Sequence, residues 1–215
     1  MSRILITSGP TRQYLDPVRY LTNASSGRMG AALAAAVLEA GHRAVVVSGP
    51  VDIEYPEAAE VIRVVSTEEM LEACLALFPN CQGLIGAAAP CDYRPVKMSD
   101  QKIAKTGQPL LLQLVETPDV VAMCASIKES QWMVAFALET EEPRMRALQK
   151  LERKSCDLIV LNGPGVIHSR HTELEVIDRT GQTLARIAGP KEEAARELFR
   201  LIHRQLMDPA RDAGR

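Results

Sequence analysis

The chain has 215 residues, of which 47% are hydrophobic and 24% charged, a composition typical of one globular domain with a sizeable core. Its formal net charge of -2 provides no general attraction to nucleic acid or to an anionic membrane, so we expect neither as a partner. No apolar run approaches a membrane span, no signal-peptide pattern is found, and five scattered cysteines without C-x-x-C spacing favour reduced thiols. We therefore expect a cytoplasmic protein with a single domain over residues 1–207 and a flexible C-terminal tail over residues 208–215.

Strand-like and helix-like segments alternate through the first two thirds of the chain. The predicted strands are Ile4–Ser8, Ala44–Val47, Gly83–Ala88, Met133–Ala137 and Leu158–Leu161, and the predicted helices between them are Ser26–Ala40, Glu68–Phe78, Pro118–Ile127 and Pro143–Lys154. This alternation predicts an α/β fold, a Rossmann-like and mostly parallel sheet with helices on both faces. Segments Glu173–Gly181 and Thr183–Ile187 then predict a C-terminal β-hairpin appendage, and a last helix follows from Pro190.

Two helix starts carry explicit signals. Ser66-Thr-Glu-Glu69 is a capping box, and Thr117 followed by Pro118 predicts an N-cap with proline at the first helical position. The least regular region is 90–110, and an irregular stretch of that length is more often functional than accidental.

A polar loop leads directly into the first predicted helix. Ser25, Ser26 and Gly27 would offer hydroxyls, unpaired backbone N–H groups and the positive end of the helix dipole to an anion. Arg19, Asn23 and Arg28 add side-chain donors beside them, and Gly27 and Gly30 would leave the backbone open to a phosphate or carboxylate. The alternative is an ordinary capped helix whose glycines serve close packing.

A second polar loop follows the predicted strand that ends near Gly86, Ala87 and Ala88. Open α/β sheets bind ligands at the carboxyl ends of their strands, so Asp92 is a candidate for polar recognition. Lys102 and Lys105 could close over a polyphosphate and neutralise its charge. The alternative is a charged loop that is simply solvated.

Several common chemistries lack their motifs. Tyr93 and Lys97 have the spacing of a short-chain dehydrogenase pair, but Pro95 between them opposes a continuous helix. The chain has no G-x-G-x-x-G fingerprint, no P-loop, no nucleophile elbow and no clustered His/Cys set for a catalytic metal, so no metal-binding residue is predicted.

Seven motifs occur in one order along the chain. They are T-R-x-x-L-D-P-V-R-Y-x-x-N-x-S-S-G-x-M-G at 11–30, V-S-G-P at 47–50, D-Y-R at 92–94, K-I-x-K at 102–105, E-T-P-D at 116–119, F-x-x-E-T at 136–140 and D-L-I-V-x-N at 157–162. Together they resemble phosphopantothenate–cysteine ligase, the second half of the bifunctional coenzyme A biosynthesis protein. The resemblance covers residues from about 3 to about 190.

The resemblance implies that 4′-phosphopantothenate attacks the α-phosphate of CTP and that L-cysteine then displaces CMP from the acyl nucleotide. It implies Mg²⁺ with the triphosphate, a homodimer whose subunits complete each other's sites, and no flavin, because the flavin-binding half is not seen. A separate phosphopantothenoylcysteine decarboxylase could then be a partner.

Site residues are carried over by motif. Asn23 and Lys102 are expected to be catalytic, and the substrate is expected to contact Arg19, Asn23, Ser25, Ser26 and Gly27. The expected nucleotide-binding residues are Gly86, Ala87, Ala88, Asp92, Lys102, Lys105, Thr117, Pro118, Phe136 and Lys150.

Three departures from the family pattern bear on the choice of nucleotide and on the site. Ala104 stands where many bacterial members have lysine, Gly163 where aspartate is common, and Ser8-Gly-Pro replaces a Gly-Gly opening. CTP is preferred here, with ATP as the alternative. Two other classes remain open, an NAD(P)-dependent short-chain-type reductase and a non-catalytic nucleotide-binding regulator.

Overall fold

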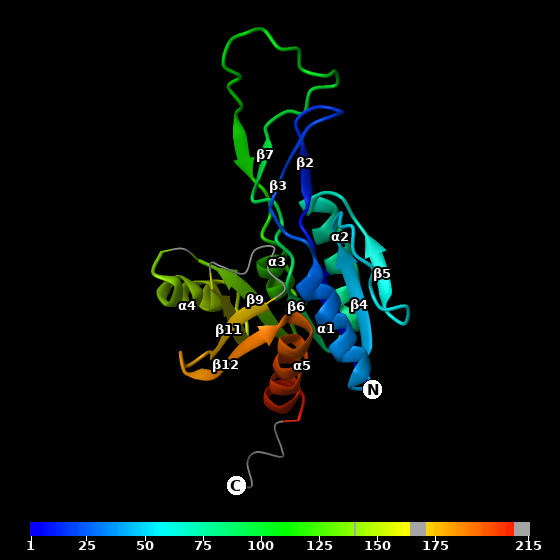
Figure 1. The fold of residues 1–215 in the computed structure, drawn as a ribbon, viewed down its shortest axis with the longest axis vertical. Coiled ribbons are helices and arrows are strands. Elements are labelled where there is room, and N and C mark those ends of the chain that lie inside the picture. The colour runs from blue at the N-terminus through cyan, green and yellow to red at the C-terminus, as the bar shows by residue number, and fades with distance from the viewer. Residues whose placement is uncertain (140, 164–170, 209–215) are drawn as a thin grey trace.

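The computed structural model describes residues 1–139, 141–163 and 171–208, and it is built around one eight-stranded sheet. The strand order is β12-β11-β10-β9-β6-β1-β4-β5, and the six strands from β10 to β5 pair in parallel (Figure 1). Their bounds are β1 Arg3–Ser8, β4 Arg43–Ser48, β5 Glu60–Arg63, β6 Gly83–Gly86, β9 Trp132–Leu138 and β10 Leu158–Asn162. The mostly parallel α/β architecture predicted from the sequence is confirmed.

Two apolar layers cover the two faces of the sheet. Helices α1 (Arg28–Glu39) and α5 (Lys191–Ile202) pack on one face, where Leu33 and Leu198 are fully buried. Helices α2 (Thr67–Leu77), α3 (Val120–Ser126) and α4 (Pro143–Arg153) pack on the other. A 3₁₀ turn, Phe78–Asn80, follows α2, and a π-helical turn, His203–Met207, follows α5. The predicted placement of helices on both faces is therefore confirmed.

The predicted C-terminal hairpin is also present, and it extends the central sheet. Strand β11 (His171–Asp178) pairs antiparallel with β10, and β12 (Thr183–Pro190) pairs antiparallel with β11. The hairpin thus adds two strands to the sheet beyond β10, and helix α5 packs against both of them. Of the predicted tail, only Asp208 falls among the described residues.

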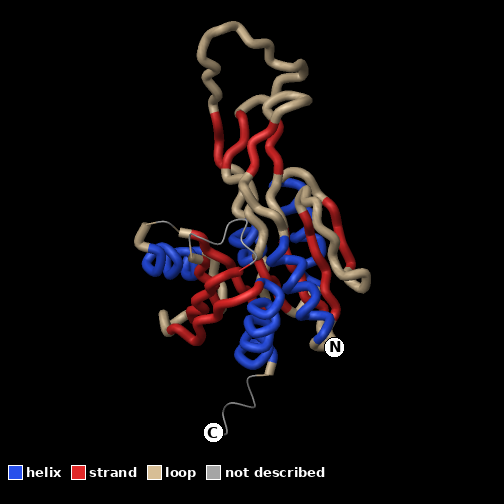
Figure 2. Tube along the Cα trace, viewed as in Figure 1, coloured by secondary structure: helices blue, strands red, loops and turns tan. Residues whose placement is uncertain are grey.

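An arm of two small hairpins projects from one end of the body (Figures 1 and 2). One hairpin joins β2 (Arg12–Tyr14) to β3 (Tyr20–Thr22), and the other joins β7 (Tyr93–Pro95) to β8 (Leu114–Glu116). The sequence predicted none of these short strands, nor β5, and treated region 90–110 only as irregular. A long loop, residues 96–113, connects β7 to β8 at the end of the arm.

Two predicted helix starts are wrong by about two residues. Helix α1 begins at Arg28, because Gly27 is left-handed with φ 74° and leaves Ser25 and Ser26 ahead of the helix. Helix α3 begins at Val120, because the Asp119 side chain accepts a hydrogen bond from the Ala122 N–H at 3.1 Å and acts as N-cap. The Ser66 cap of α2 is confirmed by the 3.1 Å bond from the Glu69 N–H.

Other features of the body agree with the composition. All five cysteines are free and buried. The single tryptophan, Trp132, is buried against Gly83, where a β-carbon would lie only 2.2 Å from its ring. Among the described residues no helix is both long and apolar enough to cross a membrane.

Candidate functional site

Two adjoining cavities open at the carboxyl ends of the parallel strands. Cavity 1 has a volume of about 550 Å³ and cavity 2 about 470 Å³. Both are bounded by the same six residues where they meet: Ala88, Pro90, Asp92, Phe136, Lys150 and Lys154. The chain passes from β1 to β4 on one side and returns to β6 on the other, so the cavities lie at a topological switch point, where open α/β sheets bind ligands.

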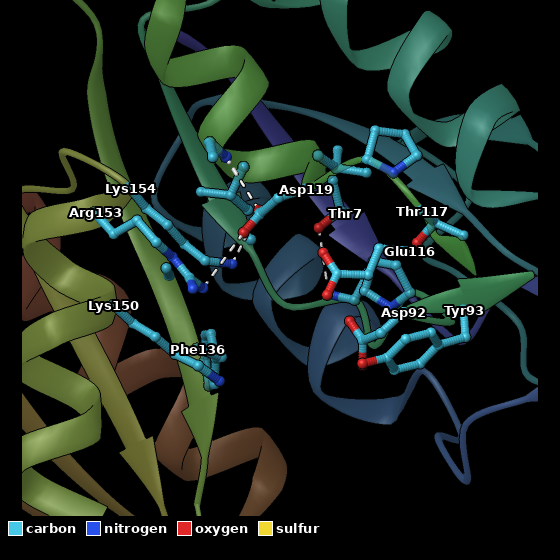
Figure 3. Close-up of a pocket in the computed structure, with 18 residues that line it drawn as sticks. Thr7, Asp92, Tyr93, Glu116, Thr117, Asp119, Phe136, Lys150, Arg153 and Lys154 are labelled. Carbon is cyan, nitrogen blue, oxygen red and sulfur yellow. Dashed lines mark hydrogen bonds and ion pairs between the residues drawn. The ribbon is translucent and has the colours of Figure 1, made fainter. Parts of the chain in front are cut away.

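One wall of cavity 1 is cationic. Helix α4 places Lys150, Arg153 and Lys154 along it (Figure 3), because positions one helical turn apart share a face. Asp119 lies against this wall, with its Oδ1 3.0 Å from Lys154 Nζ and its Oδ2 3.7 Å from Arg153 Nη2. The excess positive charge suits an anionic ligand.

The ionisation of Asp119 follows from these contacts. Burial alone would raise the pKa of its carboxyl, but Lys154 and the Ala122 N–H favour the charged form and lower the pKa overall. Lys150 has a different counter-ion, because its Nζ lies 2.5 Å from Glu139 Oε1, and the Glu139 side chain is only 10% exposed. Each lysine is thus held in place by one carboxylate, Lys150 by Glu139 and Lys154 by Asp119.

The opposite wall of cavity 1 is made by the segments that follow β6 and β8. The Ala88 N–H donates to Thr7 Oγ1 at 3.2 Å, which fixes the turn after β6 at the end of β1 (Figure 3). The Thr117 N–H donates to the Asp92 carbonyl at 2.9 Å, and the Thr117 hydroxyl donates to the Cys91 carbonyl at 2.7 Å. The exposed Asp92 carboxylate is therefore carried on a well-tied backbone.

Cavity 2 is lined by the loop that precedes α1. The loop contributes Asn23, Ser25, Ser26 and Gly27 to its lining. Asn23 is anchored, since its Nδ2 donates to the Pro90 carbonyl at 2.8 Å and weakly to the Ala89 carbonyl at 3.4 Å. This amide therefore ties the α1 loop to the β6 loop at the boundary of the two cavities.

The two glycines of this region serve packing. A β-carbon at Gly30 would lie 2.1 Å from Ser8 Oγ, so helix α1 approaches β1 as closely as only glycine allows. Gly27 has a positive φ, and its carbonyl accepts a 3.1 Å hydrogen bond from Ser8 Oγ. Gly30 also lines cavity 2, although Ser8 fills the space where its β-carbon would lie, so the expectation that Gly30 leaves the backbone open to a ligand stays a prediction.

The far wall of cavity 2 comes from β10, β11 and α5. Lys191 is only 8% exposed, and burial first, then repulsion from Arg28, lowers the pKa of its ammonium group. Within the described residues Thr172 Oγ1 and Asn162 Oδ1 are buried without a hydrogen-bond partner. A polar ligand in cavity 2 would meet all three groups.

The structure thus brings most of the predicted site residues together. Those lining cavity 1 are Gly86, Ala88, Asp92, Thr117, Pro118, Phe136 and Lys150, and those lining cavity 2 include Asn23, Ser25, Ser26, Gly27 and Ala87. Arg19, Lys102 and Lys105 line neither cavity of the same chain. Arg19 instead binds Asp16 and the Ile103 carbonyl, and the two lysines are exposed on the arm.

Sequence reasoning missed several cavity-lining side chains, among them Arg153, Lys154, Asn162, Thr172 and Lys191. For two of these residues the sequence contains a pattern that could have identified them. Lys154 follows Lys150 by four residues on the same helix, and Asn162 ends the D-L-I-V-x-N motif. No local pattern marks Lys191 or Thr172, because their place in the site depends on the packing of α5 and β11 against the sheet.

The fold and the position of the two cavities define the class of protein: a Rossmann-like α/β domain with a candidate ligand site at the switch point of its sheet. The chain belongs to the family of the DNA/pantothenate metabolism flavoprotein C-terminal domain, whose family model matches residues 1–206. It is 38% identical over 211 residues to the coenzyme A biosynthesis bifunctional protein CoaBC of Vibrio cholerae, covering 95% of this chain and 53% of the relative. The CoaBC of Haemophilus influenzae is 35% identical over 205 residues, 94% of this chain and 51% of the relative. The chain therefore spans about half the length of these relatives.

Solved structures agree with this assignment. The crystal structure of a C-terminal domain of CoaBC is 33% identical and superposes with a TM-score of 0.80 over 96% of each chain. A Cab2 mutant in complex with phosphopantothenate-cysteine superposes with a TM-score of 0.76 over 100% of this chain and 89% of that chain. At 15% identity the latter shows only a common fold.

Proposed function

We propose that this chain is a phosphopantothenate–cysteine ligase acting in coenzyme A biosynthesis. The single observation that carries the proposal is that a cavity with one cationic wall and an Asn-Ser-Ser-Gly cavity meet at Phe136 and Lys150. Two reactants held in neighbouring cavities can react at the boundary between them. The relatives named for coenzyme A biosynthesis support this choice of reactants, and the Cab2 complex is an example of the same fold with phosphopantothenate-cysteine bound.

We assign the nucleotide to cavity 1. Lys150, Arg153 and Lys154 neutralise the phosphates, and the segment after β6 with Asp92 contacts the rest of the nucleotide. Base edges differ between CTP and ATP while phosphates do not, so we place the nucleotide choice at the Asp92 side, with CTP preferred. The described residues contain no group of three or more metal-ligating side chains, which fits Mg²⁺ held mainly by the phosphates it accompanies.

We assign 4′-phosphopantothenate to cavity 2. Its carboxylate attacks the α-phosphorus of the nucleotide, so that pyrophosphate leaves and an acyl nucleotide forms. The amine of L-cysteine then attacks the acyl carbonyl carbon, the nucleoside monophosphate leaves, and the amide product remains. Asn23 lines cavity 2 and binds Pro90 at the boundary of the cavities, and its second N–H, held only weakly by the Ala89 carbonyl at 3.4 Å, would turn to polarise the acyl carbonyl.

We assign Lys102, Lys105 and Arg19 to the site of a second copy of the chain. Exposed apolar side chains cover the arm; they are Val18, Tyr20, Tyr93, Val96, Met98, Leu110, Leu111, Leu112, Leu114 and Val115. Exposed apolar side chains concentrated on one projecting segment are typical of protein interfaces, and isolated two-stranded hairpins need packing partners for stability. A homodimer through the arms would cover this surface and carry the three cations toward the partner's cavities.

One assay tests the proposal. Purified chain with Mg²⁺, CTP and 4′-phosphopantothenate should release pyrophosphate, and adding L-cysteine should yield the amide product by mass spectrometry. CTP binding without pyrophosphate release would make the chain a regulator, and oxidation of NADPH would favour the reductase. Turnover with ATP above that with CTP would overturn the CTP assignment.

A matched pair of variants tests the nucleotide assignment. Asp92→Ala should weaken CTP use, while Asp100→Ala should not, because Asp100 is an exposed acid on the arm loop that lines neither cavity. Equal kinetics of the two variants would remove Asp92 from the site.

A further inference from the structure

The Asp16 carboxylate lies on the turn between β2 and β3, and its side chain is completely buried. Its Oδ1 accepts hydrogen bonds from the N–H groups of Val18 and Arg19, both at 2.9 Å. These two bonds build the turn itself. The other oxygen, Oδ2, accepts from the Arg19 guanidinium, with Nε at 3.0 Å.

The same oxygen also reaches the distant arm loop. The Ile103 N–H donates to Asp16 Oδ2 at 3.1 Å, and Arg19 Nη2 donates to the Ile103 carbonyl at 2.6 Å. Both backbone polar groups of Ile103 are therefore held by one acid–arginine pair. A further bond, from the Ser99 N–H to the Leu15 carbonyl at 2.9 Å, joins the same two segments.

Ile103 lies in the long arm loop, between Lys102 and Lys105. Residues 96–113 form a long loop without regular structure at the end of the arm (Figure 2), and such a loop loses much conformational freedom when it is fixed. Ile103 is half-buried, while Lys102 before it and Lys105 after it are exposed. The Asp16–Arg19 pair thus fixes the backbone between the two lysines and leaves their ammonium groups free to face outward.

The Asp16 carboxyl is ionised. Burial opposes its ionisation, but the bonds from Val18, Arg19 and Ile103 outweigh burial and hold the pKa of the carboxyl well below its ordinary value. The carboxylate that accepts the Ile103 N–H is therefore charged at neutral pH.

We propose that Asp16 is a positioning residue, which acts through Arg19 and Ile103 to present Lys102 and Lys105 to the nucleotide phosphates. This inference rests on the proposed ligase function and deepens it. The competing explanation is that Asp16 only builds the β2–β3 turn, in which case the arm loop and nucleotide kinetics are independent of Oδ2.

Asp16→Asn separates the two explanations. The amide keeps an oxygen for the Val18 and Arg19 N–H bonds, so the turn remains, but it places an N–H₂ donor opposite the donors of Ile103 and Arg19. Glu68→Gln is the matched control, because Glu68 also pairs with an arginine at the base of the arm, Arg94, at 3.0 Å, and its other partner, Gln13, lies on β2 and not on the loop.

The first readout is local proteolysis, which does not depend on the proposed reaction. Trypsin should cleave the Lys102–Ile103 bond about tenfold faster in Asp16→Asn than in the wild type, because cleavage requires local opening of the loop. Glu68→Gln should match the wild type. Equal cleavage in Asp16→Asn and the wild type would overturn the proposal.

The second readout compares the KM values for the two substrates CTP and L-cysteine. The KM for CTP should rise about tenfold in Asp16→Asn, while the KM for L-cysteine stays unchanged. Faster cleavage with an unchanged KM for CTP would overturn the positioning role. A wild type that releases no pyrophosphate would instead overturn the ligase function, and trypsin would still report whether Asp16 holds the loop.

A second variant covers the case in which Asp16→Asn does not fold. Ile103→Pro removes the N–H donor from the loop side and leaves the Asp16–Arg19 pair intact. It should raise the KM for CTP as Asp16→Asn does, whereas Ile103→Ala keeps the N–H and should raise it less. Equal KM values for the two Ile103 variants would overturn the proposal.

Discussion

Lys154 Nζ lies 3.0 Å from Asp119 Oδ1, so the carboxylate that caps helix α3 is also the counter-ion of a lysine in cavity 1. One side chain thereby couples the stability of a helix to the charge of the proposed nucleotide site. Asn could replace Asp in the cap, because it also accepts the Ala122 N–H, but it could not replace the charge.

Asp119→Asn should therefore lower the free energy of unfolding at pH 7 by less than about 1 kcal/mol, since the ion pair is partly exposed. The pKa of Asp119 is lowered from 3.8, so its charge stabilises the fold above that pH and the contribution is lost as pH falls through the folded-state pKa. Urea unfolding at pH 7 and at pH 3 measures both. A difference between variant and wild type that persists at the lower pH would contradict this assignment.

A second pH-sensitive contact joins His42, just before β4, to His203 at the end of helix α5. His42 Nδ1 accepts the Ser2 N–H at 3.2 Å, and its ring lies 5.2 Å from that of His203. Burial and then repulsion from His203 lower the pKa of His42 from 6.5, so the unfolded chain binds the proton more readily as pH falls below that value. The melting temperature should fall between pH 7 and pH 5, and less steeply in His42→Asn. Parallel pH curves would show that His42 is not responsible.

Lys102 should act on chemistry and not on the fold. Lys102→Gln removes a charge from an exposed position on the arm and should slow acyl-nucleotide formation on the order of a hundredfold, as the loss of an electrostatic stabiliser does. The melting temperature should be unchanged. Rapid-quench measurement of pyrophosphate release checks the rate, and a rate near that of the wild type would remove Lys102 from the site.

Asn23 should act on the second half-reaction. Asn23→Asp replaces an amide donor by a negative charge, which would repel the developing oxyanion at the acyl carbonyl. The variant should release pyrophosphate once and accumulate the acyl nucleotide, which mass spectrometry of a quenched reaction containing L-cysteine detects. If the bond to Pro90 is its whole role, both half-reactions should fall together.

Mixing these two variants tests the shared site. If Lys102 serves the partner's cavities, a heterodimer of Lys102→Gln with Asn23→Asp has one intact site, and a statistical mixture regains roughly a quarter of wild-type activity. If Lys102 serves its own chain, both sites of the heterodimer remain defective and the mixture stays inactive. Native mass spectrometry of the mixture, with an affinity tag on one of the two variants, establishes that the dimers have exchanged.

The body of the fold was predictable because its segments are long and periodic. The β1 core residues Ile4, Leu5 and Ile6 are fully buried, and the Ser66 cap marks α2 before any tertiary contact forms. The arm was not predictable, because strands of three residues such as Arg12–Tyr14 carry no detectable alternation.

The candidate site divides in the same way. Asn23, Asp92 and Phe136 stand in motifs whose order along the chain points to one family, and all three line the cavities. Lys191 and the Asp16–Ile103 contact depend on segments that meet only in the folded chain, so no window of sequence could reveal them.

Cavity 2 joins the loop before α1 to Lys191 at the start of α5, and these helices pack together on one face of the sheet. The pocket is thus assembled from opposite ends of the domain. During synthesis, a ribosome-bound chain would expose the Asn23 loop long before its facing wall emerged. Substrate could stabilise only the finished domain, so binding would favour completed molecules over nascent ones.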